Sequence, residues 1–374
     1  MASKMPQPRE GSRAVRNVNL PLSKTGGPLP SYSLAAINAD NFRPRWLIRG
    51  IWSHPSHGEL AGMEKTLKSW LVAAMAISVA SGRPFLGHFE VQTQGPVVIF
   101  TGESGRHLCE RRLRHLGRSL GLSAAEIDVL PIRIIDECAT TRSEVFKAAL
   151  ERDLEREPVL VILDPLYAYH GADINAGNIH ASAEVLNAVS NLTDEAGASL
   201  VIVNHFRKSA EDHLSLVSIS QAGHREWSES WALVGHKRAP AMSDVHSGHF
   251  QLEIVVGGRQ WDGDGWSLEA DIGKINRDTW KYEGEVNWKV DRRSAPTLVA
   301  LQEAILAYLK GKDGKPVKVA ELRHNITGKN SEISKAAENL ANDPAQPVSV
   351  KRGSGNTKLY MYDPSIAVTV EGVS

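Results

Sequence analysis

The chain has 374 residues, of which 42% are hydrophobic and 23% are charged, a composition typical of folded proteins with a sizeable core. Lys plus Arg equals Asp plus Glu, at 43 each. This balance excludes a histone-like or acidic-tail protein but leaves room for a local basic surface. The two cysteines, Cys109 and Cys138, are too few for a disulfide scaffold or a four-cysteine zinc site, and they favour a reducing compartment.

Length and hydropathy together predict a cytoplasmic protein of two domains and a tail. A typical domain has about 150 residues, which gives two domains for this length. The longest apolar stretch, Trp70–Ala80, is too short to span a bilayer. The first 20 residues carry charges but have no apolar core of a secretory signal. We therefore expect no membrane partner.

Residues 1–45 are rich in Pro, Ser, Gly and Arg and show no periodic apolar pattern. They contain seven Lys and Arg residues against Glu10 and Asp40. Such a composition predicts a flexible, basic N-terminal arm. The alternative is an unstructured leader without a function of its own.

Residues 46–290 alternate between short apolar runs and stretches with helical periodicity. The runs are continuously apolar, as in parallel strands covered by helices on both faces. The alternation predicts an α/β fold with a mostly parallel, doubly wound sheet. Expected strands are Pro96–Thr101, Pro158–Leu163 and Ser199–Asn204, and expected helices are Lys68–Ser81, Leu108–Leu120, Arg142–Glu155 and His180–Ala196.

The pattern changes after Trp231. Residues Phe250–Val256 and Ser267–Ile272 flank a glycine-rich turn and predict an antiparallel hairpin that extends the sheet edge. Trp227 and Trp231 are four residues apart, a spacing that favours one helix packed into the core.

Residues 291–374 predict a separate domain that follows the linker DRRSAP. The expected order is three helices and a two-stranded hairpin, which resembles a winged helix-turn-helix. The helices are expected at Leu298–Lys310, Lys318–His324 and Asn330–Asp343, and the hairpin strands at Val348–Lys351 and Lys358–Tyr362.

A candidate phosphate-binding loop leads into the helix at Lys68. The segment fits the pattern G-x-x-x-x-G-K-[ST] except that Leu67 replaces the second glycine. In this pattern backbone N–H groups surround phosphate oxygens, the lysine reaches the β- and γ-phosphates and the hydroxyl binds Mg²⁺. The alternative is a surface loop that caps an amphipathic helix. The candidate ATP-binding residues are Gly62, Met63, Glu64, Lys65, Thr66, Leu67, Lys68 and Ser69.

Polar side chains follow three of the predicted strands. Glu103 is placed to orient an attacking water, Asp164 to hold Mg²⁺ and His205 to sense the γ-phosphate. Taken singly, each is also compatible with an ordinary turn or helix cap. Their occurrence in order, each after a buried apolar run, favours a P-loop NTPase.

From Trp46 to about Val290 the chain resembles the RecA-like AAA_25 ATPases, the group of RepA-type replicative helicases of plasmids and phages. The resemblance rests on the segments KTLKSWLVAAMAISVASGRPFLGHF, VVIFTGESG, LVILDPLYAYHGADINAGN and GASLVIVNHFRKS. It implies a RecA-like fold that assembles into a homo-oligomeric, hexameric ring with ATP between subunits. By position it makes Lys68 and Ser69 phosphate and Mg²⁺ ligands, Glu103 the catalytic glutamate, Asp164 the Walker B acid and His205 the sensor.

The sequence departs from the family pattern at two places. Leu67 carries a Cβ where the loop normally has glycine, which restricts the backbone, and Lys65 adds a cation that partly compensates. The family's trans-acting arginine is not in its usual place, where Glu229 and Ser230 stand. Arg225 is the first candidate for this role and Arg207 the second.

DNA contacts are expected in two places. Single-stranded DNA would pass through the ring channel, near residues His213–Ser220, by analogy alone. Duplex DNA would bind the C-terminal domain, which has twelve Lys and Arg against nine Asp and Glu. The alternative for that domain is protein docking or oligomerisation. The candidate DNA-binding residues are Arg323, Lys329, Lys335, Lys351, Arg352 and Lys358, with His324 beside them.

The sequence thus predicts a Mg²⁺- and ATP-dependent DNA helicase or translocase of the RecA-like ring type, acting in replication of a mobile element. Two alternatives stay open. One is a replication initiator that binds ATP without hydrolysing it, which Leu67 favours. The other is a recombination-mediator ATPase that coats single-stranded DNA without unwinding it.

Overall fold

The computed structural model describes residues 45–170, 179–207, 214–219, 223–238, 248–292, 298–326, 328, 330–353, 355 and 357–368. The expected N-terminal arm lies outside the described residues except for Arg45. Of the expected channel loop, only residues 214–219 are described. None of the described helices combines the length and the apolar composition that a membrane crossing needs.

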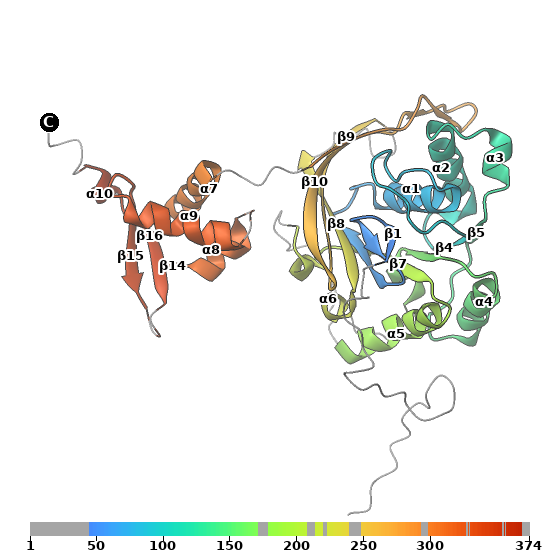
Figure 1. Cartoon of the computed structure of the whole chain (residues 1–374), viewed down its shortest axis with the longest axis horizontal. Coiled ribbons are helices and arrows are strands. Elements are labelled where there is room, and N and C mark those ends of the chain that lie inside the picture. Colours follow the sequence, from blue (N-terminus) through green and yellow to red (C-terminus); the bar gives the residue numbers. More distant parts are fainter. Residues whose placement is uncertain are drawn as a thin grey trace, which may run out of the picture. The chain divides into compact units, whose positions relative to one another are not determined.

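A large sheet forms the centre of the part of the chain between residues 45 and 292 (Figure 1). Its strand order is β13-β10-β9-β8-β3-β7-β6-β4-β5. The six strands from β8 to β5 are parallel, and the other three are antiparallel. The mostly parallel α/β sheet is therefore confirmed. The strands are β3 His57–Gly62, β4 Val97–Thr101, β5 Ile132–Ile135, β6 Leu160–Asp164, β7 Ser199–His205, β8 Ser230–Arg238, β9 His249–Gly258, β10 Trp261–Asp271 and β13 Asn287–Arg292.

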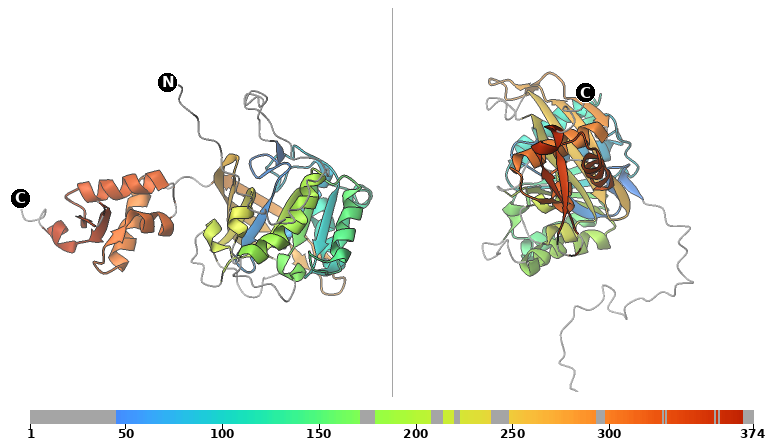
Figure 2. Two further views of the ribbon diagram at one scale, coloured as in Figure 1. Left: turned by 90° about the horizontal axis from the view of Figure 1, so that it is seen from below. Right: turned by 90° about the vertical axis from the view of Figure 1, so that its left-hand side faces the viewer.

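Helices cover both faces of the parallel strands, as Figures 1 and 2 show. In β4, Val97 and Ile99 pack into the core that contains α1, whereas Val98 and Phe100 pack with residues of α4 and α5. Because both faces are covered, β4 and β6 are apolar up to their last residue. One face carries α1 Lys68–Ser81, α2 Gly105–Ser119 and α3 Ala124–Asp128, and the other carries α4 Glu144–Leu154 and α5 Ile179–Glu195.

The expected hairpin is confirmed as β9 and β10, which extend the sheet beyond β8. The expectation of one helix through Trp227 and Trp231 is wrong, because α6 ends at Trp227 and β8 begins at Ser230. The pairing of β8 with β3 and β9 overrides the local helical spacing. In addition, β13 reaches Arg292, two residues past the expected domain boundary.

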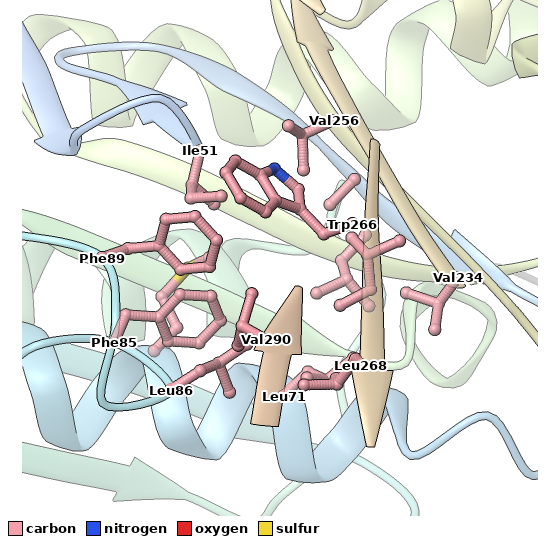
Figure 3. A pocket seen from close by; sticks show the side chains of 14 residues that line it. Ile51, Leu71, Phe85, Leu86, Phe89, Val234, Val256, Trp266, Leu268 and Val290 are labelled. Carbon is pink, nitrogen blue, oxygen red and sulfur yellow. The ribbon is translucent and has the colours of Figure 1, made fainter. Parts of the chain in front are cut away.

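Several short elements complete this part of the chain. They are β1 Trp46–Ile48, β2 Trp52–Ser53, η3 Leu166–Tyr169, η4 Leu216–Ser218, α6 His224–Trp227, β11 Lys274–Ile275 and β12 Tyr282–Glu283. A small apolar cavity of about 20 Å³ lies in the core, with Phe85, Phe89 and Trp266 among its lining side chains (Figure 3). It has room for about one water and no polar lining, so it is a packing gap and not a nucleotide site.

The C-terminal elements have their own hydrophobic core, which includes Leu301, Ile305, Ile333, Leu340 and Tyr360. The expected three helices and hairpin are present, and a short third strand joins them in a sheet of order β14-β16-β15. The elements are α7 Leu298–Gly311, β14 Val317–Lys318, α8 Val319–Asn325, α9 Asn330–Asn342, β15 Val348–Arg352, β16 Lys358–Tyr362 and α10 Pro364–Val368.

Candidate nucleotide site

One edge of the central sheet gathers the predicted site residues. Parallel pairing places Gly62 beside His205 and Thr101 beside Asp164. Glu103 follows β4 by two residues and is exposed. The carboxyl ends of parallel strands are the usual ligand-binding edge of such sheets. The phosphate loop, Glu103, Asp164 and His205 therefore share this edge.

The loop between β3 and α1 adopts a left-handed backbone at two non-glycine residues. Lys65 has φ 62°, and Leu67 has φ 59° and ψ 23° at the N-cap of α1. Leu67 thus takes the conformation that favours glycine, at a cost of about 1–2 kcal/mol. Its side chain is 6% exposed and belongs to the core around α1. Burial of this side chain offsets the backbone cost, so the substitution does not prevent the loop from forming.

The loop is packed against β8. A Cβ at Gly62 would lie 2.3 Å from the carbonyl oxygen of Val234, so only glycine fits there. His236 places its Nε2 3.1 Å from the carbonyl oxygen of Glu64. Within the loop, the buried Thr66 hydroxyl donates to the carbonyl of Met63 at 2.9 Å. These contacts fix the loop before any ligand binds.

Lys68 is buried beneath the loop. Its Nζ donates to the carbonyl oxygens of Gly62 at 3.1 Å and Met63 at 2.5 Å. Burial lowers the pKa of Lys68 to about 8, although Asp164, Glu64 and Glu103 oppose the shift. The helix α1 begins at this residue without a side-chain cap. A cation beside an uncapped helix N-terminus is suited to bind an anion.

Ser69 and Asp164 form the second half of the site. Ser69 and Asp164, of which Asp164 is 8% exposed, line one small cavity of about 10 Å³. Burial raises the pKa of Asp164, while the neighbouring Ser69 hydroxyl and the nearby Arg112 charge lower it. Neighbouring hydroxyl and carboxylate oxygens suit Mg²⁺, which takes one or two protein ligands together with phosphates. Among the described residues no larger group of His, Cys, Asp and Glu is arranged to hold a metal.

Glu103 has a partner that the sequence reasoning missed. Burial and the neighbouring Glu103 carboxylate raise the pKa of Tyr167 to about 12. The Tyr167 and His205 rings lie 6.1 Å apart. Burial and the charge of Lys68 lower the pKa of His205, so its imidazole is neutral at pH 7. Tyr167 thus lies between the candidate catalytic glutamate and the candidate sensor.

The two candidate arginines have different surroundings. The Nε of Arg225 donates to its neighbour Glu226 at 2.9 Å, and the Arg225 side chain is 52% exposed. Arg207, just after β7, donates from its Nε to the carbonyl of Ile219 at 2.9 Å. Both arginines are exposed, as a role in a neighbouring subunit requires. Exposure therefore does not rank them, and Arg225 stays the first candidate and Arg207 the second as predictions.

Further side chains near the site went unnoticed in the sequence. His236 contacts the loop and Arg112 lies near Asp164, and both contacts join residues far apart in the chain. Tyr167 was also missed, although the sequence held a signal for it, because it follows Asp164 by three residues in a motif that already carried the resemblance.

In the C-terminal part, Arg323, Lys335, Lys351, Arg352 and Lys358 are exposed, and Lys329 lies outside the described residues. Pairing places Arg352 opposite Lys358 across the hairpin, so Lys351 is on the other face. The Nζ of Lys358 lies 2.6 Å from Glu338 on α9. Arg323 donates to Ser334 through Nε at 2.9 Å. The hairpin therefore divides the predicted DNA-binding cations between two faces.

The loop, the strand-end acids and the parallel sheet agree with a comparison against protein families. Residues 26–211 match the AAA domain family, AAA_25. The match contains β3, α1, β4, β6 and β7, and thus the phosphate loop, Glu103, Asp164 and His205. Arg225, His236 and the C-terminal elements lie outside it.

Solved structures with a similar fold include an ATPase domain and a replicative helicase. The ATPase domain is 12% identical, with a TM-score of 0.43, over 57% of this chain and 80% of that chain. The helicase is DnaB-like, was solved in work on its interactions with primase, and is also 12% identical with a TM-score of 0.43. The similarity covers 58% of this chain and 56% of that helicase. No curated protein has significant sequence similarity to the chain.

Proposed function

We propose that this protein is a Mg²⁺-dependent ATPase of the RecA-like ring type that acts on DNA as a helicase or translocase. The observation that carries the proposal is that Ser69 and Asp164 line one small cavity near Lys68, at the sheet edge that also presents Glu103. A half-buried hydroxyl beside a buried carboxylate, next to a buried lysine at a helix N-terminus, is an arrangement suited to nucleoside triphosphate hydrolysis.

The chain's own groups have distinct tasks in this proposal. Lys68 leaves its two carbonyl partners and neutralises phosphate charge, and the backbone N–H groups at the start of α1 contact phosphate oxygens. Ser69 and Asp164 would hold Mg²⁺, which stabilises negative charge on the phosphates. Glu103 accepts a hydrogen bond from the attacking water and orients it. Tyr167 and the neutral His205 position Glu103 and contact the γ-phosphate end.

An active-site test compares ATP turnover by the wild type, Lys68→Ala and Glu103→Gln. We expect Glu103→Gln to lower turnover by about 10²–10⁴-fold while retaining ATP binding, and Lys68→Ala to weaken binding as well. Glu155→Gln, at the exposed C-terminal end of α4, is the matched control for the glutamate change and should leave turnover intact. Turnover in either site variant at the wild-type rate would remove the assignment.

We further propose that the ring is a homo-oligomer, that Arg225 completes the neighbour's site and that residues 291–374 form a winged-helix domain that binds duplex DNA. The exposed Arg225 and the exposed cations of α9 and the β15–β16 hairpin support this. Replication of a plasmid, phage or other mobile element is the setting that the RepA-type resemblance suggests. Strand displacement on a forked duplex distinguishes a helicase from a protein that only coats single strands.

A second candidate is an initiator that binds ATP as an assembly ligand without turnover. The left-handed Leu67 favours it, because a side chain replaces glycine in the phosphate loop. ATP binding without hydrolysis, together with nucleotide-dependent assembly measured by light scattering, is the result expected for this candidate.

A further inference from the structure

A buried arginine lies next to Ser69 and Asp164, the candidate Mg²⁺ ligands. Arg112 lies on α2 and is only 8% exposed. Burying a guanidinium is unfavourable unless its charge and donors find partners. The free-energy cost of burying Arg112 suggests that this residue has a role beyond packing.

Its contacts join the glutamate-bearing loop to the start of α1. Nη1 donates to the Ser104 hydroxyl at 3.1 Å, and Ser104 directly follows Glu103. The guanidinium carbon lies 5.8 Å from the ring centroid of Trp70, the residue after Ser69. The ring of Tyr282, a residue near the Arg112 charge, packs edge-on against Trp70 at 5.0 Å.

The same side chain faces the metal-binding acid. Arg112, Ser69, Thr101 and Asp164 line one small internal cavity of about 10 Å³. Within the described part of the chain, the buried Nε of Arg112 has no hydrogen-bond acceptor. An apolar side chain would fill this position at lower cost, so fold stability alone does not explain the arginine.

From this geometry we infer that Arg112 is a positioning residue of the nucleotide site. It holds Ser104, and with it Glu103, in register with the Ser69–Asp164 pair. The inference rests on the proposed ATPase function and adds a residue to it. Removing a residue that orients a metal ligand without itself binding the metal typically lowers metal affinity or activity by about 10–100-fold.

The test uses the full-length chain and three variants of α2. Arg112→Met keeps the stem over Trp70 but removes the charge and the donors, and Arg112→Lys restores the charge. Arg118→Met makes the same change at an exposed position of the same helix. The first measurement is equilibrium binding of a fluorescent ADP analogue at increasing Mg²⁺, which does not depend on turnover. The second is kcat and KM for ATP.

We expect Arg112→Met to raise the half-saturating Mg²⁺ concentration about tenfold and to lower kcat more than it changes KM. Arg112→Lys should recover most of the Mg²⁺ affinity, and Arg118→Met should match the wild type. A folded Arg112→Met with wild-type Mg²⁺ dependence and kcat would overturn the inference.

Ser104→Ala tests the link to Glu103 if Arg112→Met does not fold. It removes only the acceptor of the Arg112 hydrogen bond, and we expect a lower kcat with unchanged Mg²⁺ dependence. An unchanged kcat in Ser104→Ala would contradict the inference. A wild type that neither binds nor hydrolyses nucleotide would defeat the proposed function itself, which distinguishes the two failures.

Discussion

Leu67 occupies a backbone conformation that costs free energy, and a buried side chain compensates for it. Its φ of 59° lies in the left-handed region, and its side chain is 6% exposed in the core around α1. The residue therefore serves the core and the loop at once. These two contributions can be separated by substitution.

We predict that Leu67→Gly is more stable than Leu67→Ala by about 1 kcal/mol, because glycine adopts the left-handed backbone without steric cost. Both variants lose about 2–5 kcal/mol of folding stability because the buried leucine side chain is removed. In Leu67→Gly, the relief of backbone strain offsets part of this loss. Urea denaturation without nucleotide measures the difference. Ala148→Gly, at an exposed position inside α4, is the control and should destabilise by about 0.5–1 kcal/mol. A Leu67→Gly variant less stable than Leu67→Ala would contradict the assigned strain.

Lys68 gives the site a dependence on pH. Burial lowers its pKa from 10.5 to about 8, so the free protein loses this positive charge as the pH rises above about 8. Bound phosphates favour the charged lysine, so the affinity for nucleotide should fall above pH 8 by up to about tenfold per pH unit. Titration with a fluorescent ATP analogue from pH 7 to 9.5 measures this, and affinity independent of pH over that range would contradict it.

At the scale of elements, apolar runs predicted the buried strands because β4, β6 and β7 are covered on both faces. The same rule fails for β8, which contains Gly235, His236 and Lys237 and obtains its strand conformation from pairing with β3 and β9. The residues of the candidate site divide in the same way, into those that the local sequence predicts and those that depend on tertiary contacts. Strand-end residues were predictable from position, whereas Arg112 and His236 reach the site only through the tertiary fold.

The C-terminal helices and hairpin give a prediction for duplex DNA. Lys335 is exposed on α9, which we propose as the recognition helix of the winged-helix domain. A cation that contacts a phosphate contributes about 0.9 to the slope of log affinity against log salt concentration. We expect Lys335→Ala to reduce this slope by about that amount and Lys310→Ala, at the exposed end of α7, to leave it unchanged. Equal slopes for Lys335→Ala and the wild type would remove Lys335 from the interface.

At the scale of the whole molecule, the proposed motor couples one nucleotide site to DNA. The loop 214–219 contacts the strand end through Arg207, whose Nε donates to Ile219, and β7 pairs with the phosphate-loop strand β3. Through these contacts, residues 214–219 are connected to the sheet edge that carries the candidate nucleotide site. We expect DNA binding to alter the nucleotide site through this connection.

The most direct test of the central claim is the ATP turnover of the full-length protein with Mg²⁺, with and without saturating single-stranded DNA. We predict that single-stranded DNA raises kcat at least about tenfold, a change of about 1.4 kcal/mol in the activation free energy, and that Lys68→Ala abolishes the increase. A turnover that is present but unaffected by DNA would contradict a DNA motor. The absence of any turnover would leave the ATP-binding initiator as the better assignment.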